Sequence, residues 1–114
     1  MKWEDVLQRD DIVGGDLETQ EDGRVYRGPI SSIRIEGEMV YFRSPWTARM
    51  NADGTWEKWH ITGCGTNTKM CPPNDIGEGR VQFSMPMLGF GVIFPKGGSK
   101  LDPSKVKGLD LATV

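Results

Sequence analysis

Three residues with metal-binding or nucleophilic side chains lie close together in the sequence: His60, Cys64 and Cys71, spaced H-x3-C-x6-C. A structural zinc site needs four such ligands, and a catalytic one needs three and an open position. Asp75 could complete a set, but the paired C-x2-C of common zinc modules is absent. We therefore expect no bound metal, and in a reducing compartment we expect free thiols rather than a disulfide.

The same cluster could support thiol chemistry, with His60 acting as the base for Cys64. In an extended strand these side chains would stand about 13 Å apart, and a bend at Gly63 would have to shorten that distance. The sequence contains no G-x-S-x-G elbow and no phosphate-loop motif. It therefore predicts no catalytic residue and no cofactor. A small metal-binding or thiol-dependent enzyme centred on His60, Cys64 and Cys71 is kept as the alternative function.

A second group of side chains suggests binding, because three of the four tryptophans fall within 16 residues of each other. If residues 51–54 form a four-residue loop, a length common in hairpins, Trp46 lies opposite Trp59 on the inner face of a hairpin. Arg49 then lies opposite Trp56 on the outer face. A loop one residue longer or shorter would exchange these faces.

The outer face of this hairpin, residues 38–62, is the candidate binding surface. An exposed tryptophan beside cations can stack on a nucleic-acid base or contact a peptide. The cross-strand pair of an arginine and a tryptophan can also stabilise the hairpin without binding anything, and this alternative stays open. The predicted ligand-binding residues are Tyr41, Arg43, Arg49, Trp56, Lys58 and His60.

The charge distribution limits the partners that we expect. A formal net charge of -2 argues against a general nucleic-acid binder, and acidic residues are concentrated in residues 1–23. The expected partner is a protein segment or a single-stranded nucleic acid. Self-association through exposed strand edges in residues 85–94 is a third possibility. The start of the chain does not resemble a signal peptide and no long apolar run follows, so we expect a cytoplasmic protein with no membrane contact.

Short-range patterns place these side chains on a mainly β fold. Apolar side chains at i, i+3 and i+4 within residues 3–7 predict a short helix. The step Asp22-Gly23 predicts a two-residue hairpin turn, which pairs Glu21 with Arg24, Thr19 with Tyr26 and Glu18 with Arg27. Apolar side chains change face near Ser31-Ser32, which indicates a bulge or a bend. They change face again at Pro86-Met87, where one strand is interrupted or two strands are joined.

Together these elements predict a small antiparallel β-barrel of five to six strands, with a short N-terminal helix and a long loop at 63–79. The element order of residues 1–95 resembles that of small SH3-like and Sm-like barrels, although no motif allows functional residues to be carried over. An OB-like or pleckstrin-like barrel is the alternative. Residues 96–114 are expected to form a partly flexible tail with a helical turn that starts at Asp102-Pro103. The sequence thus favours a non-enzymatic binding module.

Overall fold

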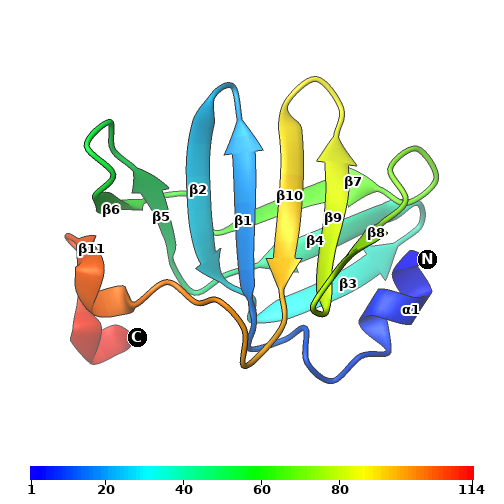
Figure 1. Ribbon diagram of the computed structural model, residues 1–114, viewed down its shortest axis with the longest axis horizontal. Coiled ribbons are helices and arrows are strands. Elements are labelled where there is room, and N and C mark those ends of the chain that lie inside the picture. Colours follow the sequence, from blue (N-terminus) through cyan, green and yellow to red (C-terminus); the bar gives the residue numbers. More distant parts are fainter.

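The chain folds into two β-sheets that pack against each other, as shown by a computed structural model that describes the backbone of residues 1–114 and every side chain except that of Thr113 (Figure 1). The larger sheet contains β1 (Asp16–Glu21), β2 (Arg24–Pro29), β5 (Thr47–Met50), β6 (Trp56–Trp59), β8 (Asn74–Gly77), β9 (Arg80–Met85), β10 (Gly89–Phe94) and β11 (Val106–Lys107). The smaller sheet contains β3 (Ser32–Glu36), β4 (Met39–Arg43) and β7 (Gly63–Asn67). The helical elements are α1 (Trp3–Leu7) and the 3-10 turns η1 (Pro103–Lys105) and η2 (Leu111–Thr113).

The strand order shows how the chain moves between the sheets. The larger sheet runs β11-β6-β5-β2-β1-β10-β9-β8, and the smaller sheet runs β3-β4-β7. All neighbouring strands are antiparallel except β11, which runs parallel to β6. In Figure 1 the strands of the smaller sheet lie behind the larger sheet and cross its strands.

The prediction of a mainly β fold with a short N-terminal helix is confirmed, but the predicted barrel is wrong. Eleven strands form two open sheets, whereas five to six strands in one closed sheet were expected. A barrel closes only when the two edge strands of one sheet pair with each other. Here β8 and β11 stay at opposite edges of the larger sheet. The chain instead leaves that sheet after β2, forms β3 and β4, and returns to it at β5.

The prediction of a long loop at residues 63–79 is also wrong, since this segment contains β7 and β8. Strand β7 pairs with β4, so that Cys64 lies opposite Phe42 and Gly65 lies opposite Tyr41. Its glycines remove the alternation of apolar side chains by which a strand is recognised in a sequence. The pairing with β4 is set by the fold rather than by local propensity.

Several local predictions are confirmed. The turn at Asp22-Gly23 pairs Glu21 with Arg24 and Glu18 with Arg27, as the sequence predicted. The change of face near Ser31-Ser32 is a bend, since it is the point at which the chain passes from β2 to β3. Likewise, the interruption at Pro86-Met87 joins two separate strands, β9 and β10.

The main core lies between the two sheets, and α1 closes one side of it. The Trp3 ring lies edge-on to the Phe83 ring at 5.2 Å, and Phe83 stacks on Phe42 at 5.4 Å. The Trp3 indole nitrogen donates a hydrogen bond to the Cys71 carbonyl, which ties the helix to the segment between β7 and β8. Among the described residues, no helix has the length and apolar character needed to cross a membrane.

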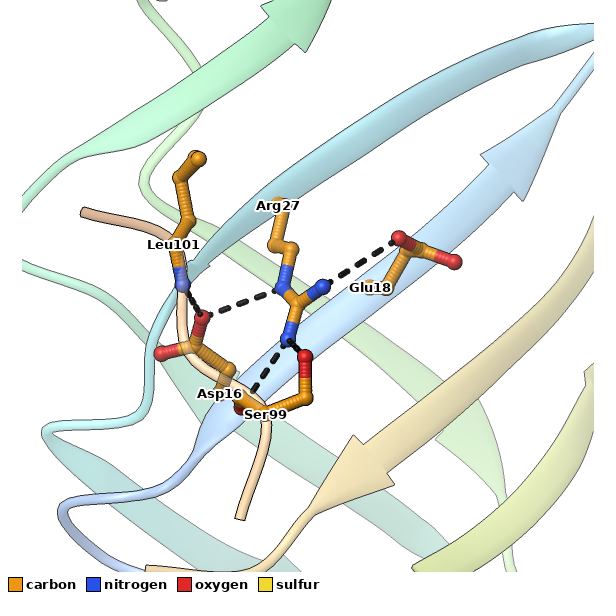
Figure 2. Close-up of polar contacts among 5 residues, drawn as sticks. All are labelled: Asp16, Glu18, Arg27, Ser99 and Leu101. Atoms are coloured by element: carbon orange, nitrogen blue, oxygen red, sulfur yellow. Dashed lines mark hydrogen bonds and ion pairs between the residues drawn. The ribbon is translucent and has the colours of Figure 1, made fainter. Parts of the chain in front are cut away.

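The C-terminal segment packs on the opposite face of the larger sheet. Figure 2 shows how it is held: the Arg27 side chain donates hydrogen bonds to Ser99 and to the Asp16 carboxylate, and the same carboxylate accepts from the Leu101 amide at 2.7 Å. A second apolar cluster forms where the segment covers β5 and β6. Its buried members are Trp46, Ala48, Leu101 and Val106.

The packing of the chain on the larger sheet continues beyond residue 95, where the sequence predicted the end of the domain. Residues 101 and 106 are buried, β11 adds a strand to the larger sheet, and Asp102 caps η1 through the Ser104 amide. The helical turn predicted at Asp102-Pro103 is therefore present as a 3-10 turn. The segment 96–107 lies along the folded sheet and supplies part of its cover.

Candidate functional site

A cavity of about 250 Å³ lies between the two sheets, on the side away from the C-terminal segment. The larger sheet lines it from β1, β2, β5 and β9, and the smaller sheet lines it from β4 and β7. Most of the lining is apolar. Its apolar side chains include Leu17, Phe42, Ile61, Met85 and Leu88.

Small residues keep this space open. Gly28 on β2 and Thr47 on β5 line the cavity side by side, and a Cβ on Gly28 would lie only 2.4 Å from the Trp46 carbonyl oxygen. Glycine at this position therefore lets β5 approach β2 closely. Ser44 and Thr19 add short side chains to the same wall. An inner face built from such residues leaves a gap where larger side chains would meet the other sheet.

The thiol of Cys64 lines the cavity close to a second ionisable side chain, that of Glu21. Desolvation by burial and, to a smaller extent, the negative charge of Glu21 together raise the pKa of the Cys64 thiol to about 12. Cys64 therefore carries a neutral thiol at physiological pH and is a weak nucleophile. Glu21 takes part in none of the ion pairs found among the described residues. The cavity thus combines apolar walls with one uncompensated carboxylate.

An aromatic shelf continues from the cavity along the same face of the larger sheet; we use this name for Tyr26, Arg49, Trp59 and His60. The Arg49 guanidinium lies 3.7 Å from the centre of the Trp59 ring. The Trp59 ring is 6.3 Å from the Tyr26 ring and 5.0 Å from the His60 ring. Tyr26 also lines the cavity, so the shelf and the cavity form one surface.

The hairpin predicted at 38–62 is divided between the two sheets, and its expected register is wrong. Thr47 lies opposite Trp59, and Arg49 lies opposite Glu57. The reason is the loop: the Asn51 amide donates a hydrogen bond to the Thr55 carbonyl, so Asn51 belongs to the paired stem and only three residues make the turn. The changed register exchanges the faces of the second strand.

The exchanged faces change the roles of the tryptophans. Trp46 is buried as predicted, but it packs in the C-terminal cluster and not against Trp59. Trp56, expected to be exposed beside Arg49, is half-buried against the C-terminal cluster. Trp59, expected in the core, is the half-buried ring that lies beneath Arg49.

The six predicted ligand-binding residues are therefore not brought together. Tyr41 and Arg43 lie on the smaller sheet, with the Arg34 guanidinium 4.9 Å from the Tyr41 ring. Trp56 and Lys58 lie on the face of β6 opposite to that of Trp59. Only Arg49 and His60 belong to the aromatic shelf.

The residues of the alternative site are dispersed as well. His60 is exposed beside Trp59, Cys64 lines the cavity, and Cys71 is buried near the Trp3 indole. Both cysteines are free thiols. Among the residues that the structure describes, no three His, Cys, Asp or Glu side chains are grouped so as to hold a metal ion.

Sequence reasoning missed Glu21, Tyr26 and Leu88 as parts of the site. The predicted register of the β1–β2 hairpin already placed Glu21 and Tyr26 on one face, because their positions share the same alternation. What the sequence did not show was the smaller sheet that turns this face into a cavity. No local pattern in the sequence indicates that Leu88 lines the same site.

Comparisons with known proteins give no information about this site. No protein-family model, curated protein or solved structure gives a significant match to this chain.

Proposed function

We propose that this chain is a binding module that accepts an apolar side chain from a segment of a partner protein in the cavity between its sheets. One observation carries the proposal: an apolar space of about 250 Å³ opens beside half-buried aromatic and charged side chains. Ligand sites are typically concave and apolar, with a few polar groups that fix orientation.

The size of the cavity favours a side chain over a large cofactor. An engineered cavity of about 150 Å³ binds benzene, and sites for drug-sized ligands span roughly 300–1,000 Å³. A space of about 250 Å³ therefore fits one large side chain or two small ones. The remaining residues of a bound segment would lie along the aromatic shelf.

Charge favours a protein segment over a nucleic acid. Glu21 lines the cavity, and it would repel phosphate groups. Arg27 also borders the cavity, but its guanidinium is already bound by Asp16 and Glu18. Binding to single strands uses several cations that track the backbone, and the shelf supplies one, Arg49. A segment with an apolar side chain next to a lysine or arginine would complement Glu21.

No catalytic role is proposed for Cys64. A catalytic cysteine acts as a thiolate, so its pKa is normally lowered by a neighbouring cation or base. The pKa of Cys64 is raised instead, to about 12, and its charged neighbour is the carboxylate of Glu21.

The proposal can be tested by fluorescence anisotropy with labelled ten-residue peptides that carry phenylalanine beside lysine, phenylalanine beside glutamate, or neither. A labelled single-stranded oligonucleotide of mixed sequence serves as the competing partner class. We expect the peptide with phenylalanine and lysine to bind most tightly. Glu21→Gln should reduce its preference over the glutamate peptide.

Filling the cavity provides the decisive variant. Cys64→Phe places a ring in the space, and it should weaken binding of the best peptide by about tenfold or more, which corresponds to about 1.4 kcal/mol. Arg43→Gln, an exposed position on the smaller sheet, is the matched control and should leave binding unchanged. If no phenylalanine peptide binds, or if Cys64→Phe binds as well as the wild type, the proposal is wrong.

A further inference from the structure

The turn between β9 and β10 has an unusual residue at its centre. The Leu88 amide donates to the Met85 carbonyl at 3.0 Å, which closes a four-residue turn with Pro86 second and Met87 third. Met87 has a φ of 65°, in the left-handed region. Proline at the second position and positive φ at the third are features of a type II turn, which normally places glycine or asparagine at the third position.

Methionine is an unfavourable choice at this position, and nothing inside the chain compensates for it. A side chain with positive φ outside glycine and asparagine is strained, and such strain is often found at functional sites. Two other non-glycine residues have a positive φ, Asp22 and Glu78, and each is followed directly by a glycine in its turn, whereas Met87 is followed by Leu88. Met87 is 100% exposed, so its side chain gains no contact from folding.

The exposed methionine lies in the turn between two residues that both contribute to the lining of the cavity, Met85 and Leu88. Its neighbour Leu88 lines the cavity and is 49% exposed. The Leu88 carbonyl accepts a hydrogen bond from the Asp22 amide, which fixes this turn against the tip of the β1–β2 hairpin. Both hairpin tips lie at the same end of the molecule, at the top of Figure 1. The molecule therefore presents an apolar projection directly beside an apolar hollow.

The same end carries two unpaired charges of opposite sign. Glu21 and Arg24 lie opposite each other in the β1–β2 hairpin. Neither forms an ion pair with any residue that the structure describes. A surface with a projection, a hollow, an acid and a base side by side is complementary to a copy of itself rotated by a two-fold axis.

We propose that the partner segment is the Met85–Leu88 turn of a second copy of this chain, with each Met87 side chain inserted into the cavity of the other copy. This inference rests on the proposed function, since it uses the same cavity. The flexible thioether side chain of methionine adapts well to an irregular apolar space. Glu21 of each copy would then face Arg24 of the other.

The test measures molar mass by sedimentation equilibrium up to roughly 500 µM, a range that detects sub-millimolar dissociation constants. We expect the wild-type chain to form a dimer. Met87→Asn should shift it to a monomer. At a concentration low enough for both proteins to be monomeric, Met87→Asn should also raise the melting temperature by a few degrees, because asparagine tolerates positive φ. Met70→Asn is the matched control, since Met70 is 72% exposed in another turn, and it should remain a dimer.

The outcomes separate this inference from the proposed function. A wild-type chain that stays monomeric, or a dimer that persists in Met87→Asn, overturns the inference. A dimer that persists in Cys64→Phe overturns it too, because the projection would then occupy some other surface. If Met87→Asn protein still binds the phenylalanine peptide while the wild type is a monomer, the cavity is a binding site for another protein and only the second copy is excluded.

Discussion

The pKa of Cys64 shows how the surroundings of one residue change its chemistry. The backbone of β7 directs its side chain into the space between the sheets, where few water molecules can solvate a thiolate. Desolvation and the nearby carboxylate of Glu21 both disfavour the ionised form, which raises the pKa of Cys64 to about 12 from an ordinary value of 9.0. The residue is therefore suited to line an apolar site.

This raised pKa predicts a dependence of stability on pH. In the unfolded chain the thiol loses its proton near pH 9, whereas in the folded chain it keeps the proton until about pH 12. Over this window the unfolded state binds fewer protons, so stability falls as pH rises. We expect the free energy of unfolding of the wild type, measured by urea denaturation, to fall by a few kcal/mol relative to that of Cys64→Ala between these limits. Parallel pH profiles would contradict the prediction.

At the scale of elements, the pairing of β5 with β2 brings the chain back from the smaller sheet to the larger one. The close approach of these two strands also forms one wall of the cavity. The two strands pair through Tyr26 with Arg49 and Arg27 with Ala48. Gly28 extends this contact, because its missing side chain leaves room for the Trp46 carbonyl. The wall therefore depends on one glycine whose role is steric.

Gly28→Ala should separate the two strands. A Cβ at 2.4 Å from the Trp46 carbonyl oxygen requires the backbone to shift, so we expect a loss of about 2 kcal/mol or more in the free energy of unfolding. Gly37→Ala is the control: its φ is +61° but nothing lies within 4 Å of the added Cβ, and about 1 kcal/mol of strain is expected. Urea denaturation of both variants measures the loss in the free energy of unfolding for each. Equal losses would argue against a steric role for Gly28.

At the scale of the whole molecule, the larger sheet is covered on both faces by different means. The smaller sheet covers one face and forms the main core. The C-terminal segment covers part of the other face, held by the contacts of Arg27 and Asp16 and by the cluster around Trp46. Without that segment, Trp46 and Trp56 would be left beside an unpaired β6 edge, which is a site for aggregation.

The C-terminal segment should therefore contribute to global stability. Leu101 is 8% exposed, and Leu101→Ala is expected to lower the free energy of unfolding by about 2–5 kcal/mol. Leu111→Ala removes the same atoms from a side chain that is 54% exposed, and a change within about 0.5 kcal/mol is expected. Thermal denaturation of both variants measures the difference. Matching melting temperatures would show that the segment is dispensable for the fold.

Local patterns in the sequence are sufficient to predict the features that depend on neighbouring residues. The helix at residues 3–7 follows from the spacing of its apolar side chains, and the Asp22-Gly23 turn follows from its need for positive φ. The pairing of Glu21 with Arg24 then follows from the two-residue turn. Turn chemistry and periodicity are local, so such features can be predicted without knowing the fold.

The division of the strands between two sheets, and the side chains that share a face, depend instead on the packing of the whole chain. One extra paired residue, Asn51, exchanged the faces of Trp56 and Trp59, because side chains alternate along a strand. The cavity depends on the smaller sheet lying over β1 and β2, a contact between segments far apart in the chain. Such packing depends on the shape and burial of the whole molecule, and a local pattern carries no information about either.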